Sequence, residues 1–100
     1  MEIDNKTVWI TGASSGIGLE LCRQLAAKGA RIVLSARRKD TLVEIAKSLP
    51  GGLTRHWVVP LDLAVADDTL VTFVQGQLAE IGPVHILINN GGISQRSLFI

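Results

Sequence analysis

The sequence predicts an α/β domain built on a doubly wound parallel sheet, and three features of its 100 residues indicate this fold class. Short apolar runs alternate with longer segments whose apolar residues recur at the 3.6-residue period of a helix. The short runs are apolar on both faces, as strands covered by helices on both sides are. A glycine-rich turn joins the first run to the first helical segment. Such alternation favours right-handed crossovers between parallel strands.

The first third of the chain predicts a strand, a helix and a second strand. Residues 7–11 read Thr-Val-Trp-Ile-Thr, a short β-rich run. Residues 15–28 have helical periodicity, and Gly29 ends the helix. Residues 31–35 (Arg-Ile-Val-Leu-Ser) predict the second strand. The residues expected to share one face of the helix are Ile17, Leu21, Leu25 and Ala26.

The middle of the chain predicts a second helix and a third strand. Residues 40–49 place apolar side chains at i, i+3, i+4 and i+7, and Pro50-Gly51-Gly52 ends the helix. Residues 54–61 predict the third strand. The inward positions of the helix are Leu42, Ile45, Ala46 and Leu49.

The last third predicts a helix over residues 66–81, closed by Gly82-Pro83, and a fourth strand over residues 84–89. Gly91-Gly92 breaks this strand, and a further helix is expected to begin within residues 94–100. The inward positions of the helix over 66–81 are Leu70, Phe73, Val74, Leu78 and Ile81.

Composition excludes several classes of protein. With 47% apolar and 19% charged residues the chain is not disordered, and a net charge of +1 gives no basis for nucleic-acid binding. No apolar run approaches the roughly 20 residues of a membrane helix, and the amino terminus is polar and acidic rather than a signal peptide. The single cysteine cannot form an internal disulfide. We therefore expect at most one domain, and we expect it to be soluble and cytoplasmic.

Several conspicuous side chains are interpreted as structural. Cys22 lies among apolar neighbours and is expected to fill the core. His56 and His85 have no partner at metal-ligand spacing, so surface or sheet-end positions are expected for them. Trp9 and Trp57 are expected in the core or packed against helices.

The segment Thr11-Gly12-Ala13-Ser14-Ser15-Gly16-Ile17-Gly18 lies between the first strand and the first helix. Its first glycine allows a sharp turn, its second allows the backbone to approach a pyrophosphate, and its third allows close helix packing. The phosphates would then lie against free N–H groups at the positive end of the helix dipole. This pattern predicts a dinucleotide-binding turn.

Chain order predicts where the ligand would lie. In a doubly wound sheet the first three strands build outward and the fourth returns beside the first, giving the order 3-2-1-4, and the ligand binds at that reversal, beyond the carboxyl ends of the strands. Two glycine-bearing loops flank this crevice, at residues 12–18 and 90–92. Their convergence favours a binding site over two ordinary turns.

The end of the second strand indicates the cofactor. A carboxylate there would bind the adenosine ribose hydroxyls and repel a 2′-phosphate, but the chain reads Ser35-Ala36-Arg37-Arg38. An arginine can make charge-assisted, bidentate bonds to phosphate. We therefore predict NADP(H) rather than NAD(H), the alternative being that Arg37 and Arg38 form only a solvated helix start.

Polar residues also follow the third and fourth strands. Asp62 is predicted to accept a hydrogen bond from the adenine amino group, with the Leu63 N–H reaching a ring nitrogen. The alternative for Asp62 is an acid at the start of the next helix. Asn89 and Asn90 either fix neighbouring strand ends or contact the ribose.

These motifs together resemble the short-chain dehydrogenase/reductase family. The residues that carry the resemblance are 11–18, Asp62-Leu63 and Asn89-Asn90-Gly91-Gly92, in that order and spacing, and the match runs along essentially the whole chain. Residues 89–98 are also similar to the subgroup called dehydrogenase/reductase member 7. The family usually has alanine where Gly91 stands and often an acid where His85 stands.

The resemblance implies a Rossmann-like, NADP-preferring fold and assigns roles to individual residues. By resemblance, serines and Ile17 of the glycine turn line the phosphates and nicotinamide, Arg37 binds the 2′-phosphate, and Asp62-Leu63 hold the adenine. The expected cofactor-binding residues are Gly12, Ser14, Ser15, Gly16, Ile17, Gly18, Arg37, Arg38, Asp62, Leu63, Asn89, Gly91 and Gly92.

The family's catalytic residues are not expected within the chain but downstream of Ile100. By resemblance they are an Asn, a Ser and a Tyr-x-x-x-Lys pair that follow the Asn-Asn-Ala-Gly loop, and this chain contains no tyrosine. The fourth strand would also be an uncovered apolar edge, which soluble proteins avoid. We therefore expect residues 1–100 to be the N-terminal, NADP-binding half of one domain, incomplete at residue 100.

Three functions remain open. The first is an NADP(H)-dependent oxidoreductase, a dimer or tetramer, that interconverts a small-molecule carbonyl and alcohol by hydride transfer. The second is a catalytically inactive NADP(H)-binding sensor or scaffold. The third is a site for another nucleotide or a sugar nucleotide.

Overall fold

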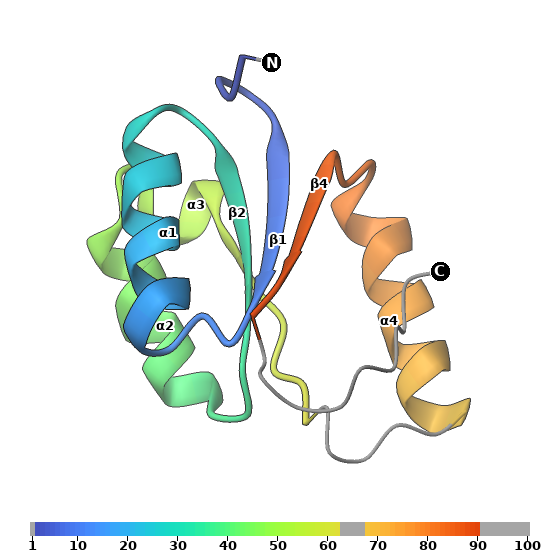
Figure 1. The fold of residues 1–100 in the computed structure, drawn as a ribbon. Coiled ribbons are helices and arrows are strands. Elements are labelled where there is room, and N and C mark those ends of the chain that lie inside the picture. Colours follow the sequence, from blue (N-terminus) through green and yellow to red (C-terminus); the bar gives the residue numbers. More distant parts are fainter. Residues whose placement is uncertain (1, 63–67, 91–100) are drawn as a thin grey trace.

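The computed structural model describes residues 2–62 and 68–90, and these form a four-stranded parallel sheet of order β3-β2-β1-β4 (Figure 1). The predicted fold class and strand order are confirmed. The regular ladders follow the apolar runs of the sequence, with β1 and β2 at the predicted bounds. The strands are β1 (Thr7–Thr11), β2 (Arg31–Ser35), β3 (Trp57–Val58) and β4 (Ile86–Asn89).

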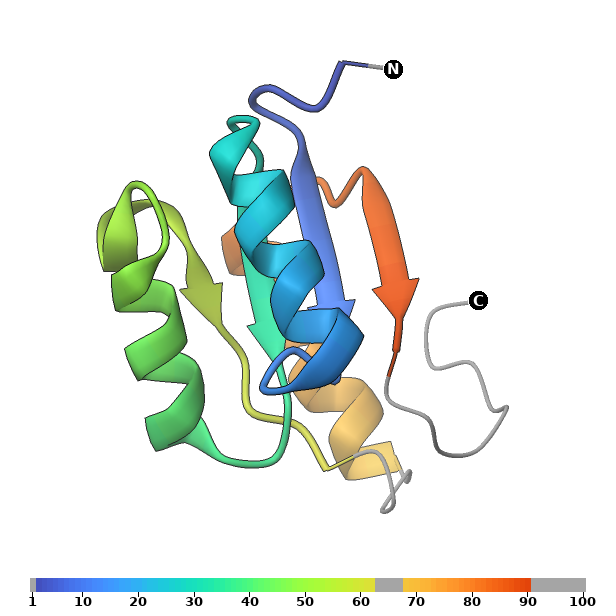
Figure 2. The same cartoon turned by 60° about the vertical axis from the view of Figure 1, so that its left-hand side comes forward.

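Helices cover both faces of the sheet. In Figures 1 and 2, α1 and α2 lie on one face and α4 lies on the other. The short α3 follows α2 and packs beside it. The helices are α1 (Gly16–Ala27), α2 (Lys39–Ser48), α3 (Gly52–Arg55) and α4 (Asp68–Ile81).

The alternation of side chains along β1 builds two separate cores. Val8 and Ile10 point to the α1–α2 face, while Trp9 between them points to the α4 face, because successive strand residues face opposite sides. All three are at most 1% exposed. The first core is completed by Ala13, Cys22, Ala26, Ala30, Ile32, Leu34, Leu42, Ala46 and Leu49, and the second by Val33, Val59, Leu61, Val74 and Ile81.

The predicted third strand over residues 54–61 is wrong in its first half. Gly51 and Gly52 adopt positive φ angles of 94° and 56°, which let the chain re-enter a helical turn, α3, before β3 begins. The regular ladder ends at Val58. Backbone bonds to β2 nevertheless continue to Leu61, whose N–H donates to the Ala36 carbonyl (2.8 Å). Pro60, the residue before Leu61, has no N–H to donate to β2.

Two residues predicted to face inward are exposed instead. Ile17 is 71% exposed, because the buried stripe of α1 runs one residue later, through Gly18 and its i+4 successors. Phe73 is 40% exposed, because the stripe of α4 runs through Val74 and ends at Ile81. The helix expected within residues 94–100 lies outside the described residues.

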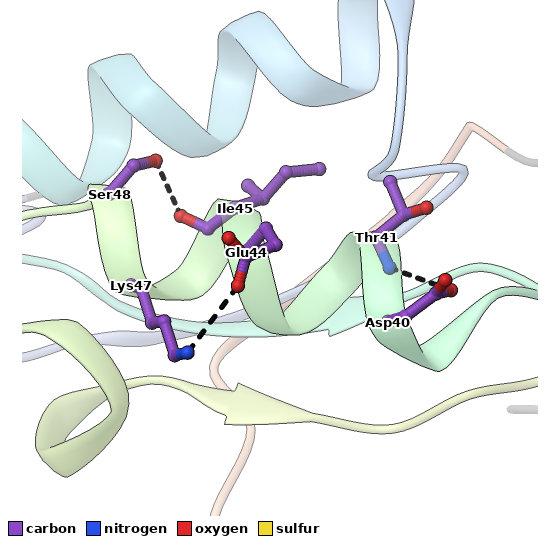
Figure 3. A network of polar contacts seen from close by, with 6 residues as sticks. All are labelled: Asp40, Thr41, Glu44, Ile45, Lys47 and Ser48. Carbon is purple, nitrogen blue, oxygen red and sulfur yellow. Dashed lines mark hydrogen bonds and ion pairs between the residues drawn. The ribbon is translucent and has the colours of Figure 1, made fainter.

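The outer face of α2 carries short polar contacts (Figure 3). The Glu44 Oε2 and Lys47 Nζ atoms lie 3.4 Å apart, and Asp40 Oδ1 accepts a hydrogen bond from the Thr41 N–H (2.9 Å). Both side chains of the ion pair are more than half exposed, so the pair contributes little stability. Burial of Leu42 and the residues beyond it on the inner face therefore holds α2 on the sheet.

Candidate dinucleotide site

The carboxyl ends of three strands lie level at one edge of the sheet. Thr11, the last residue of β1, is in register with Ser35 at the end of β2 and with Asn89 at the end of β4. The glycine turn, the Ala36–Arg38 segment and Asn90 follow these three residues directly. The structure therefore brings together the segments that the sequence predicted to converge (Figure 1).

The Thr11 hydroxyl joins the first loop to the end of β4. Its Oγ1 donates to Asn89 Oδ1 (2.9 Å) and accepts from the Asn90 N–H (2.9 Å). The Asn90 Nδ2 in turn lies 3.5 Å from the Gly12 carbonyl oxygen. Of the two roles left open for the asparagines, the structure contains the contacts of the structural one. A direct contact of Asn89 with a cofactor stays a prediction.

The β2 end holds the glycine turn from the other side. The Ser35 carbonyl accepts a hydrogen bond from the Ala13 N–H (3.1 Å). The Ser35 hydroxyl accepts one from Trp9 Nε1 (2.7 Å), and both side chains are buried. Sequence reasoning missed Thr11 and Ser35 as supports of the loop, and their only signal was a hydroxyl side chain at the end of a strand.

The three glycines of the turn each meet a different constraint. Gly12 and Gly16 have φ angles of 64° and 58°, which other residues rarely adopt. Gly18 has no such φ, but a β-carbon there would lie 2.9 Å from the Gly12 carbonyl carbon and 2.8 Å from Asn90 Nδ2. At Gly16 the β-carbon would meet nothing within 4 Å. The geometry matches the turn, open approach and close packing expected from the sequence.

The amino terminus of α1 is free of side-chain caps. Ser15 is its N-cap residue in an extended conformation, its side chain makes no capping bond, and the first turn contains no acid. The first N–H groups of a helix have no partner within the helix and lie at its positive end. Ser15, Gly16 and Ile17 are exposed there and Ser14 is half-buried. These residues fit a phosphate group.

The amino terminus of α2 carries three consecutive cations, Arg37, Arg38 and Lys39, all exposed. Cations are unfavourable at the positive end of a helix, by about 0.3–1 kcal/mol each. In the part of the chain that the structure describes, neither arginine forms an ion pair, and a single acid, Asp40, lies in the first turn of α2 beside the three cations. Arg38 is the N-cap residue of α2, so it does begin a helix. An anion bound here would attract these cations, and their net electrostatic interaction would then be favourable.

Asp62 follows the segment that runs beside β2. The Leu61 N–H bonds to the Ala36 carbonyl, which places exposed Asp62 at the same edge of the sheet as Arg37. The contact of Asp62 with adenine stays a prediction.

Some of the predicted positions fall outside the described residues. Three expected cofactor-binding residues, Leu63, Gly91 and Gly92, are among them. Ile100 is another, so the expectation that the catalytic residues follow Ile100 also stays a prediction. The geometry of the candidate site therefore rests on the turn at residues 12–18, the segment at 36–38, Asp62 and the two asparagines.

The structural roles predicted for Cys22 and Trp9 are confirmed. Cys22 is fully buried, and burial raises the pKa of its thiol to about 12, so it is core filling rather than a nucleophile. Trp9 is buried in the second core. His56 and His85 directly precede β3 and β4, which confirms the sheet-end position predicted for them, and His56 is buried there at 3% exposure rather than on the surface.

The described residues do not form a metal centre or a membrane-spanning helix. Over residues 2–62 and 68–90, no three potential metal ligands cluster. No helix in the same ranges is long and apolar enough to cross a bilayer. A hollow of about 300 Å³ lies beside β4, lined by Trp9, Leu78, Val84, His85 and Leu87. Val84 and His85 precede β4, so this hollow lies toward the opposite edge from the glycine turn.

The fold and the glycine turn define a nucleotide-binding α/β domain, and comparison with known proteins identifies its family. The short chain dehydrogenase family model matches residues 6–100, so the chain belongs to that oxidoreductase family. It is 44% identical over 101 residues to dehydrogenase/reductase SDR family member 7 of Homo sapiens, covering 97% of this chain and 30% of that protein. The chain thus spans about a third of the length of the curated relatives it matches.

Solved structures have the same fold. A short chain dehydrogenase from Salmonella enterica superposes with a TM-score of 0.81 at 25% identity, over 92% of this chain and 39% of that one. A putative short chain dehydrogenase from Escherichia coli, complexed with NADPH, has a TM-score of 0.80 at 24% identity, over 92% and 40% of the two chains. These likenesses agree with the Rossmann-like sheet described above.

Proposed function

We propose that the protein is an NADP(H)-dependent oxidoreductase that interconverts a carbonyl and an alcohol, and that this chain supplies the part that binds the cofactor. The observation that carries the cofactor choice is the placement of Arg37 and Arg38. They follow β2 at the positive end of α2, where NAD-specific sites need a carboxylate. The E. coli structure with NADPH supports the fold, and the arginines support the choice of cofactor.

Each part of the proposed site has a separate task. The free N–H groups at the start of α1 would bind the pyrophosphate, with Gly12 and Gly16 giving the backbone its turn. Arg37 and Arg38 would hold the 2′-phosphate by charge-assisted bonds. Asp62 would accept a hydrogen bond from the adenine amino group. When bound, the cofactor supplies the hydride of the reaction.

The substrate and the oligomeric assembly are properties that we propose for the whole protein. We expect a small-molecule carbonyl or alcohol as substrate and a dimer or tetramer as the assembly, by analogy with the family. We place no catalytic residue within residues 1–100. The second candidate is a catalytically inactive NADP(H)-binding module, which would use the same cofactor site. NADPH-dependent turnover of any member of a panel of ketones and aldehydes would exclude it.

Cofactor titration with charge-reversal variants tests the proposal. Each charge-assisted bond to phosphate is worth about 1.5–3 kcal/mol, or roughly tenfold to a hundredfold in affinity. Arg37→Glu should therefore raise the Kd for NADPH by about that factor while leaving the Kd for NADH within a few fold. Fluorescence of the reduced nicotinamide measures both constants.

Lys47→Glu is the matched control for this experiment. It makes the same change in net charge, but Lys47 lies in the last turn of α2, at the opposite end of that helix from Arg37. It should leave the ratio of the two dissociation constants unchanged. The proposal fails if Arg37→Glu and Arg38→Glu both leave that ratio as it is in the wild type.

A further inference from the structure

His56 lies buried between three segments at the amino edge of the sheet. Its Nδ1 accepts a hydrogen bond from the Ile32 N–H of β2 (3.0 Å), and its Nε2 lies 2.6 Å from the Pro50 carbonyl oxygen after α2. Its own backbone N–H donates to the Gly52 carbonyl at the start of α3 (3.0 Å). One residue therefore joins β2 to the whole connection between α2 and β3.

These contacts require one protonation state of the imidazole. A carbonyl oxygen can only accept, so Nε2 carries the hydrogen, and Nδ1 must be unprotonated to accept from Ile32. The cationic ring carries a hydrogen on both nitrogens, and its Nδ1–H would face the Ile32 N–H. Protonation would then leave a buried backbone donor without its partner, a costly state.

The surroundings of His56 oppose the cationic form. Burial is the main cause that lowers the pKa of His56 from 6.5, and the positive charges of Arg55 on α3 and Arg31 on β2 act in the same direction. The hydrogen bond to the Pro50 carbonyl acts the opposite way but does not outweigh burial. Both charged groups that act on the ring are cations, from the two elements beside it.

His85 makes the same hydrogen bond in an exposed place. Its Nδ1 accepts from the Thr7 N–H (3.0 Å), and its backbone N–H donates to the Thr7 carbonyl (2.9 Å). Each histidine immediately precedes a strand and accepts an N–H near the start of the neighbouring strand. His85 is exposed, whereas His56 is buried. It therefore serves as an internal comparison for His56.

We propose that His56 is an acid-sensitive latch, which holds the amino end of β2 to the α2–β3 connection at neutral pH and releases it when the imidazole takes up a proton. The latch lies at the end of the sheet opposite the glycine turn, and its hydrogen-bond partners, Ile32, Pro50 and Gly52, are not residues of the proposed cofactor site. Release frees the Ile32 N–H and detaches the chain before β3, which is an edge strand in the described sheet.

The direction of the pH effect follows from linkage. A histidine whose pKa is lower in the folded state binds more protons when released, so the closed state keeps its full stability above 6.5. That stability falls as the pH drops from 6.5 toward the lower folded value. Each unit by which folding lowers the pKa makes opening about tenfold more favourable in acid.

Amide hydrogen exchange of Ile32 measures the opening. Its protection factor should fall between pH 7.5 and pH 5, because the folded pKa of His56 is lowered from 6.5. In His56→Asn the side-chain oxygen takes the place of Nδ1 as acceptor but does not titrate, so the Ile32 protection factor should be independent of pH. In His85→Asn, the matched control, Ile32 should keep the pH dependence of the wild type.

A second measurement, on the wild-type protein, tests the proposal without the variants. Nitrogen-15 spectra of the imidazole at pH 7.5 should show the Nε2–H tautomer of His56, with Nδ1 as the acceptor. An Nδ1–H tautomer would overturn the proposal. So would an Ile32 protection factor that is equal at pH 7.5 and pH 5, or a pH dependence that His85→Asn abolishes.

Discussion

Gly18→Ala tests the close packing of the glycine turn against α1. The new β-carbon would lie 2.9 Å from the Gly12 carbonyl carbon, and closer still to its oxygen, whereas ordinary contact begins at 3.4 Å. The obstacle is backbone, so the turn itself must move. Overpacking of this kind costs about 1–3 kcal/mol, and the better helix propensity of alanine returns at most about 1 kcal/mol. We expect a net loss of about 1–2 kcal/mol in the free energy of unfolding.

Gly76→Ala is the control with the same chemistry and no obstacle. Gly76 lies inside α4, and its β-carbon would meet nothing within 4 Å. Here only the propensity gain remains, so stability should rise by about 0.5–1 kcal/mol. Urea unfolding followed by circular dichroism measures both variants. A Gly18→Ala protein as stable as the wild type would refute the packing argument.

Three further perturbations test other contacts. Thr11→Val removes the hydroxyl that joins the turn to Asn89, and should cost about 1–3 kcal/mol in urea unfolding and weaken NADPH binding; an unchanged Kd would show that the hydroxyl does not support the turn. Cys22, with its pKa raised to about 12, should not react with a disulfide reagent at pH 8 until the protein unfolds, and rapid labelling of the native protein would contradict its burial. Arg31→Lys should lose the stacking on Trp57, whose ring centroid lies 5.6 Å from the guanidinium carbon, and so lower stability by about 0.5–1 kcal/mol; an unchanged urea midpoint would mean that the stacking contributes nothing.

The sheet and helices could be predicted because local periodicity and chain topology agree. Residues 7–11 and 31–35 are strands with the predicted bounds, since an apolar run between two turn signals has one arrangement that buries both faces. The start of the third strand could not be predicted in the same way. Its first residues form α3 because Gly51 and Gly52 adopt positive φ angles, and composition does not reveal whether paired glycines end a helix or start another.

In the candidate site, too, some features could be predicted from the local sequence and others could not. Gly12, Gly16 and Gly18 were predictable because each glycine answers a backbone constraint that the motif itself implies. The hydroxyls of Thr11 and Ser35 were not, because their side-chain partners lie 78 and 26 residues away along the chain. Long-range hydrogen bonds of single side chains leave no periodic trace in a sequence.

The central claim is that the carboxyl edge of the sheet binds a 2′-phosphorylated dinucleotide. The most direct test is an NADPH titration of the labelled protein, followed by amide chemical shifts. We expect saturable shifts at residues 12–18 and 36–38, and we expect NADH to reproduce them at the glycine turn but not at Arg37. Shifts confined to the opposite edge, around Val84 and His85, or no saturable shift at all, would contradict it.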